Sequence, residues 1–132
     1  FRSATSGPGV LIALASLSAA IGAVALAYGA KKHLGRQWAL AARVIEGHDL
    51  ITDGPFGWVR HPIYLAMGLL LLSPIICFSS WLGAALALSL FVTGTALRVQ
   101  AEEGILRETF GSRYEDYRNR VPAFLPQLKR RR

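Results

Sequence analysis

Three short stretches of this sequence carry side chains that could bind a charged ligand beside apolar surroundings. They are Arg60-His61-Pro62-Ile63-Tyr64, Arg98 with Glu102 and Glu103, and the segment from His48 to Phe56. Together they offer cations, carboxylates, an imidazole and a glycine-containing turn whose main chain can approach a ligand. This set suits a ligand that has a charged head group and an apolar remainder.

Other kinds of chemistry lack their usual residues. Nothing resembles a nucleophile activated by a base, and the phosphate-binding pattern GxxxxGK[ST] does not occur. The three histidines, at positions 33, 48 and 61, have neither HxxxH spacing nor a cysteine partner. We therefore expect no metal site, and the single cysteine, Cys77, can form no disulfide within the chain.

Two of these stretches also have an ordinary explanation, which is favoured when each is considered alone, and the segment from His48 to Phe56 is a weak signal as an isolated motif. Residues 60–64 could be the border of a membrane helix, where cations and an interfacial tyrosine are common. Arg98 and Glu102 could form a surface ion pair between residues i and i+4, worth only about 0.3–0.5 kcal/mol. Ionisable groups next to a long apolar run nevertheless tend to mark functional sites.

Two stretches without a charged residue, 8–30 and 62–97, determine the expected fold. A helix needs about 20 apolar residues to cross a bilayer core roughly 30 Å thick. The first stretch therefore fits one span. The second would make a helix of about 54 Å, which fits two short spans joined by a turn at residues 78–81.

We thus predict an all-α integral membrane bundle in a single domain, 1–132, with three membrane helices at about 8–30, 62–78 and 81–97. A loop, 31–61, and a C-terminal region, 98–132, lie outside the membrane, and the latter forms a helix at the surface. Pro62 suits the first turn of its helix because its missing N–H is not needed there. The third helix need not stop at residue 97, and Gly111 is a suitable point for a break.

Small residues in the first span predict helix packing. Ala15, Ala19, Ala23 and Ala27 recur at every fourth position, which allows close approach of another helix. The chain begins with Phe1 rather than Met, which leaves room for further helices before this sequence.

The positive charge indicates the orientation. Of 15 Lys and Arg residues, five lie in the 31–61 loop and nine lie from Arg98 onward. The positive-inside rule places both regions in the cytosol, and three spans are consistent with this. A basic rim facing anionic lipids explains the sequence pI of about 10.3, so we expect membrane lipids and no nucleic acid as partners.

The ordered motifs resemble those of the isoprenylcysteine carboxyl methyltransferase family and of the related phospholipid N-methyltransferases. The similar stretches are "LGRQW" (34–38), "EGHDLITDGPFGWVRHPIYL" (46–65), "R-x-x-x-EE-x-x-L-x-x-x-FG-x-x-Y-x-x-Y" (98–117) and "RVPAFLP" (120–126). The resemblance covers about residues 34–126. It implies a multi-pass membrane enzyme that uses S-adenosylmethionine, with its active site on the cytosolic face.

The resemblance also assigns roles to residues. Cofactor contacts would fall on His48, Asp49, Leu50, Ile51, Phe56, His61, Pro62, Ile63, Tyr64 and Glu102. The family's substrate-carboxylate arginine, which is also the expected catalytic residue, would fall on Arg98. This sequence departs from the pattern at Phe56, where a tyrosine is common, and at Ala41, where some members have a cofactor-binding glutamine.

The expected reaction is carboxyl O-methylation of an isoprenylcysteine-like or other lipophilic carboxylate, carried by a small molecule or a lipidated substrate. Such an acceptor is already nucleophilic and needs orientation, which the planar fork of Arg98 can provide. Phospholipid or amine N-methylation is the alternative reaction, in which His61 or Glu102 would act as the base. A non-enzymatic membrane subunit is the competing class.

Overall fold

The computed structural model describes residues 7–35, 49–78 and 80–125. These residues form four α-helices and one 3-10 turn, and no strand occurs among them, in agreement with the expected all-α class. The helices are α1 (Gly7–Leu34), α2 (Pro62–Phe78), α3 (Trp81–Phe110) and α4 (Ser112–Arg120), and the 3-10 turn is η2 (Gly54–Gly57).

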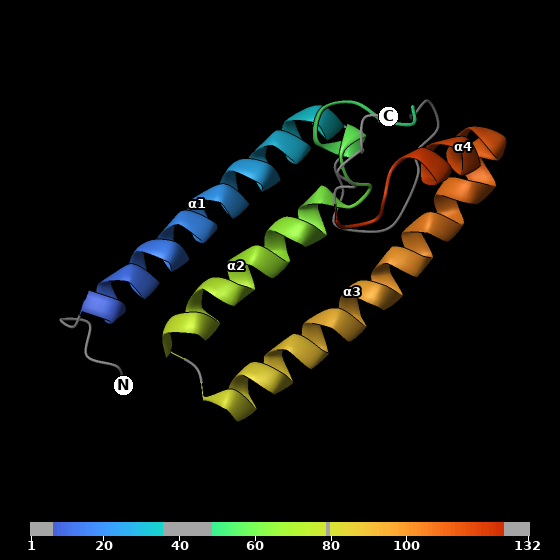
Figure 1. Cartoon of the computed structure of the whole chain (residues 1–132). Coiled ribbons are helices and arrows are strands. Elements are labelled where there is room, and N and C mark those ends of the chain that lie inside the picture. Colours follow the sequence, from blue (N-terminus) through green and yellow to red (C-terminus); the bar gives the residue numbers. More distant parts are fainter. Residues whose placement is uncertain (1–6, 36–48, 79, 126–132) are drawn as a thin grey trace, which may run out of the picture.

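The helices run up and down, so that two distant parts of the chain share one end of the molecule (Figure 1). Helix α1 ends there, η2 and the start of α2 follow, and α3 returns to the same end to meet α4. We call this the polar end. The connection from α2 to α3 lies at the opposite end. The described parts of the loop, 31–35 and 49–61, and residues 98–125 of the C-terminal region therefore share one end, as the charge pattern predicts.

Helices α1 and α2 pack side by side through small residues. Ser16 and Ser73 are buried and bond reciprocally: each hydroxyl donates to the other residue's main-chain carbonyl, at 3.1 Å from Ser16 and 2.8 Å from Ser73. Ala23 and Ala30 continue the buried face of α1. The predicted stripe is thus only partly right, because the buried positions recur every seven residues and Ala15 is exposed.

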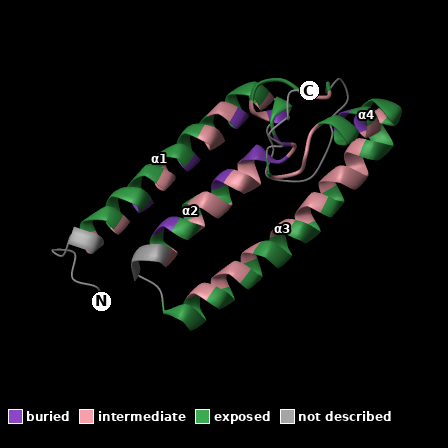
Figure 2. Ribbon diagram, viewed as in Figure 1, coloured by how far each residue is buried: buried purple, intermediate pink, exposed green. Residues whose placement is uncertain are grey.

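Two helices are long and apolar enough to cross a membrane, within α1 (Gly9–Leu34) and over the whole of α3. Only 11% of the apolar window of α1 and none of that of α3 is buried inside the molecule. The core helix of a soluble protein would instead be covered, so this exposure favours contact with lipid. Figure 2 shows the same contrast, with buried residues gathered on α1, α2, α4 and the polar end.

Helix α2 is the shorter of the three expected spans. It has exactly the predicted bounds but only 17 residues, which correspond to about 25 Å of helix. It therefore falls short of the length that crosses a bilayer without adjustment.

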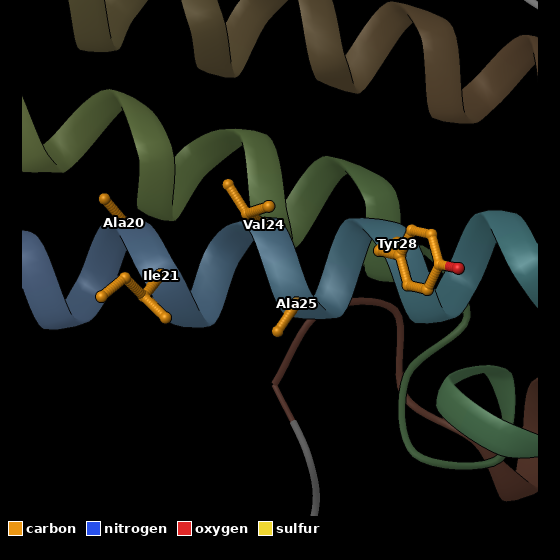
Figure 3. A pocket seen from close by; sticks show the side chains of 5 residues that line it. All are labelled: Ala20, Ile21, Val24, Ala25 and Tyr28. Carbon is orange, nitrogen blue, oxygen red and sulfur yellow. The ribbon is translucent and has the colours of Figure 1, made fainter.

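A shallow apolar pocket of about 480 Å³ lies on α1 alone (Figure 3). Its lining residues are Ala20, Ile21, Val24, Ala25 and Tyr28. Because no charged residue takes part, the pocket belongs to the apolar surface of α1 and is separate from the charged residues of the polar end.

Candidate functional site

The segment after α4 supplies hydrogen-bond acceptors at the start of α2. The main-chain N–H groups of Arg60 and His61 donate to the carbonyls of Pro122 (2.8 Å) and Ala123 (3.1 Å). The first N–H groups of a helix have no partner within the helix, so such outside acceptors stabilise its start. Pro62 follows at the first helical position, as predicted, and is fully buried.

Tyr64, Arg98 and Glu102 form the first of two polar clusters, which we call the tyrosine cluster. The Tyr64 hydroxyl donates to Oε1 of Glu102 at 2.5 Å and accepts from Nε of Arg98 at 3.1 Å. Arg98 Nε also lies 3.3 Å from the same carboxylate oxygen. The side chains of Arg98 and Glu102 are 39% and 27% exposed, so the cluster is accessible to a ligand.

The second cluster surrounds Glu103, and we call it the Glu103 cluster. Oε1 of Glu103 accepts from Nε and Nη2 of Arg60, at 3.2 and 2.9 Å, and lies 3.0 Å from Nε2 of His61. Nη1 of Arg60 donates to the carbonyls of Arg118 and Val121, both at 2.9 Å. The cluster therefore joins the start of α2, α3 and the end of α4 through the partly buried Glu103 carboxylate and the Arg60 guanidinium.

His61 connects the two clusters. Its side chain is only 5% exposed, with Nε2 on Glu103 and Nδ1 3.9 Å from Oε2 of Glu102. The ring lies 5.7 Å from that of Phe124 and 6.1 Å from that of Tyr64, measured between centroids. The imidazole is thus held between aromatic side chains with one nitrogen toward each carboxylate.

Helix α4 holds the η2 turn in place. The Tyr117 hydroxyl donates to the Phe56 carbonyl at 2.7 Å, and both residues are buried. Burial raises the pKa of Tyr117 above its ordinary value. Burial and then the charge of Glu103 raise the pKa of Tyr114 to about 12, although its hydroxyl makes no well-formed hydrogen bond within the described residues.

The end of α1 meets the turn at Gly54. This glycine has φ +54°, and an added Cβ would overlap Nε2 of His33. The His33 ring is itself held by a 2.8 Å hydrogen bond between Nδ1 and the Gly29 carbonyl. A side chain at position 54 would therefore strain the backbone and displace the ring.

The residues predicted to bind a ligand divide into three groups. The structure brings together His61, Tyr64, Arg98 and Glu102, with Pro62 and Ile63 beside them in the first turn of α2. Phe56 is buried in η2. Asp49, Leu50 and Ile51 make no hydrogen bond or ion pair to the clusters within the described chain, and His48 lies outside the described residues.

Sequence reasoning missed two members of the site. It left Arg60 as an expected border cation and gave Glu103 no role of its own. The available signal was the Glu-Glu pair at 102–103, since adjacent helix positions point about 100° apart and can serve two different partners. Within the described residues, no group of three His, Cys, Asp or Glu side chains could hold a metal ion.

Comparisons with known proteins give a consistent relationship. Residues 13–108 match the profile described as the "Isoprenylcysteine carboxyl methyltransferase (ICMT) family". The Protein-S-isoprenylcysteine O-methyltransferase of Schizosaccharomyces pombe is 30% identical over 89 residues, which cover 67% of this chain and 38% of that protein. The Homo sapiens protein of the same name is 35% identical over 89 residues, covering 62% of this chain and 29% of that protein.

A third relative carries a different name. The nickel-cobalt-cadmium resistance protein NccN of Alcaligenes xylosoxydans xylosoxydans is 34% identical over 100 residues, covering 72% of this chain and 45% of that protein. The chain thus spans less than half the length of each of these three relatives.

Proposed function

We propose a function from the premise that this chain belongs to the isoprenylcysteine carboxyl methyltransferase family. The match confirms the resemblance found in the sequence motifs. On this basis the chain is a membrane methyltransferase that uses S-adenosylmethionine and methylates a lipophilic carboxylate, such as that of an isoprenylcysteine. The observation that carries the proposal is the partly exposed tyrosine cluster at the polar end of long apolar helices.

The residues at the polar end fit such a cofactor chemically. S-adenosylmethionine supplies an activated methyl group and carries a sulfonium, an ammonium and a carboxylate. Glu102 offers a carboxylate to a cationic group, and Tyr64 holds that carboxylate in one orientation through its 2.5 Å hydrogen bond. Glu102, His61 and Tyr64 would therefore hold the cofactor.

Arg98 is the residue that would orient the methyl acceptor. A guanidinium binds a carboxylate through two parallel N–H bonds and so fixes its plane. Hydrogen bonding to Tyr64 and Glu102 through Nε limits the rotation of the Arg98 side chain. Holding acceptor and methyl carbon at about 3–3.5 Å contributes much of the rate in such a displacement.

Three membrane crossings follow from the same proposal. Helices α1 and α3 both end at the polar end, so the chain between them has to return, and α2 is the element that does so. Its length of about 25 Å is accommodated by local thinning of the bilayer or by flanking residues that reach the interface. The basic residues of the polar end support a site on the cytosolic face.

Cofactor binding by the purified chain in detergent tests the assignment. Glu102→Ala should weaken binding of S-adenosylmethionine about tenfold, the equivalent of one charged hydrogen bond. Arg98→Ala should keep that binding and abolish methyl transfer. The matched control is Glu108→Gln on the same helix, an exposed carboxylate without a contact in the described chain. Parent-like binding and turnover in both site variants would show that the site is assigned wrongly.

An acceptor screen separates the remaining alternatives. Methylation of prenylcysteine analogues supports the carboxylate assignment, whereas methylation of aminophospholipids supports the N-methyltransferase alternative with His61 or Glu102 as base. Failure of the parent chain to bind radiolabelled S-adenosylmethionine would favour a non-enzymatic membrane subunit.

A further inference from the structure

The Glu103 carboxylate determines which nitrogen of His61 carries hydrogen. An ionised carboxylate only accepts hydrogen bonds, so the His61 nitrogen 3.0 Å from Oε1 has to be the donor. Arg60 donates to the same oxygen from two nitrogens, and a guanidinium has no acceptor atom. Oε1 therefore acts as the acceptor, and the arrangement requires a hydrogen on Nε2 of His61.

The opposite nitrogen of His61 is an acceptor when the ring is neutral. In the neutral imidazole one nitrogen donates and the other accepts, so hydrogen on Nε2 leaves a lone pair on Nδ1, whereas a charged ring would leave none. This lone pair is 3.9 Å from Oε2 of Glu102, beyond hydrogen-bonding distance. Two acceptors that face each other at this separation can both be satisfied by one N–H group placed between them.

We infer that Glu103, anchored by Arg60, is a positioning residue that keeps the His61 hydrogen on Nε2 and so makes Nδ1 and Glu102 a paired acceptor site for an ammonium group. The role assigned to Glu103 follows from its own contacts. Only the identity of the ligand, the ammonium of S-adenosylmethionine, rests on the proposed function.

Glu103 also joins helices, and a purely structural role has to be distinguished from positioning. Arg60 reaches the carbonyls of Arg118 and Val121 as well as Glu103, so loss of the carboxylate loosens several elements together. A loss of activity alone therefore proves nothing. The decisive measurement is the state of the His61 ring in the folded protein.

Nitrogen NMR of protein labelled with ¹⁵N-histidine gives this state directly. The chain has three histidines, and His61→Gln identifies the signal of interest. In the parent we expect hydrogen on Nε2, a bare Nδ1, and an Nε2–H proton shifted downfield by its carboxylate partner. Glu103→Gln should move this proton upfield, because a neutral amide is the weaker acceptor, whereas Glu108→Gln should leave it unchanged.

The ring measurement needs no ligand, so it stands apart from the proposed function. Hydrogen on Nδ1 in the parent, or an Nε2–H signal that Glu103→Gln does not move, overturns the inference. The parent spectrum alone suffices if Glu103→Gln fails to fold. For the anchor, Arg60→Ala should change the shift of the same proton and Arg60→Lys should largely restore it, and an unchanged signal in Arg60→Ala removes Arg60 from the inference.

Ligand binding tests the paired acceptors. Glu103→Gln should weaken S-adenosylmethionine about tenfold, since a hydrogen bond to a charged group is at stake. Parent-like affinity in Glu103→Gln, with the ring signal shifted, would refute the effect on the ligand and leave Glu103 with a structural role. A parent with the expected ring state that binds no S-adenosylmethionine would instead refute the proposed function and leave the ring assignment in place.

Discussion

Replacing Gly54 with alanine should destabilise the protein through two separate effects. A left-handed backbone, here φ +54°, costs an ordinary residue about 1–2 kcal/mol. The new Cβ would also overlap Nε2 of His33, so the ring has to rotate away. Rotation breaks the His33–Gly29 hydrogen bond, worth about 0.5–1.5 kcal/mol. We therefore expect a total loss of about 1.5–3.5 kcal/mol.

Unfolding by a denaturing detergent in mixed micelles measures this loss, and the chain offers a matched control. Gly35 has φ +51° with nothing within 4 Å of an added Cβ, so Gly35→Ala carries the backbone cost without the clash. Gly54→Ala introduced into His33→Ala, which already lacks the ring, should cost only the backbone part, about 1–2 kcal/mol. Equal losses for Gly54→Ala and Gly35→Ala, or the same cost of Gly54→Ala with and without the His33 ring, would refute the reasoning.

Two further predictions compare hydroxyl groups with different partners. Tyr117→Phe should lower the free energy of unfolding by about 1 kcal/mol because it removes a buried hydrogen bond to the main chain. Tyr114→Phe should leave the free energy of unfolding almost unchanged because its hydroxyl makes no such bond. Thermal unfolding followed by circular dichroism compares the two variants. Ser16→Ala and Ser73→Ala should each cost about 0.6 kcal/mol in the same assay. Ser18→Ala is the control, since that hydroxyl bonds only within its own helix, and an equal cost there would contradict the interhelical role.

Local chemistry predicted the helix boundaries well. Pro62 starts α2 and the hairpin falls at residues 78–81, because charge-free length and proline position constrain both. Ser80 caps α3 by accepting from the Gly83 N–H at 3.2 Å, and Gly111 ends α3 in a left-handed conformation. The third apolar run stops at residue 97, yet α3 continues to Phe110, because a helix ends at a breaker and not where polarity begins.

Half of the candidate site was predictable in the same way. Arg98 and Glu102 share a helix face by their spacing, and the charge pattern places Tyr64 at the same end of the molecule. The role of Glu103 was not predictable, because its partner Arg60 is 43 residues away and is itself tied to the segment after α4. The sequence pattern does not predict that the segment after α4 crosses the start of α2.

The register of α1 against α2 is a second feature that the sequence could not predict. A run of small residues indicates that a helix packs closely, but many alanines in α1 could supply the contact. The reciprocal bonds between Ser16 and Ser73 select one register, and that selection requires both helices together. Composition therefore predicted the packing, while the exact face depended on a pair of side chains.

The crossing of the C-terminal segment over α2 has a consequence for biogenesis. Residues 118–123 supply acceptors to Arg60 and His61 across a sequence separation of about 60 residues, and they are synthesised after all three long helices. The N-terminal part of a chain emerges first during synthesis. The helices can thus enter the membrane before His61 acquires its final hydrogen-bond partners. A nascent chain that has not yet delivered residue 123 would have its long helices but lack a completed site, so completion of the site is the last step of assembly.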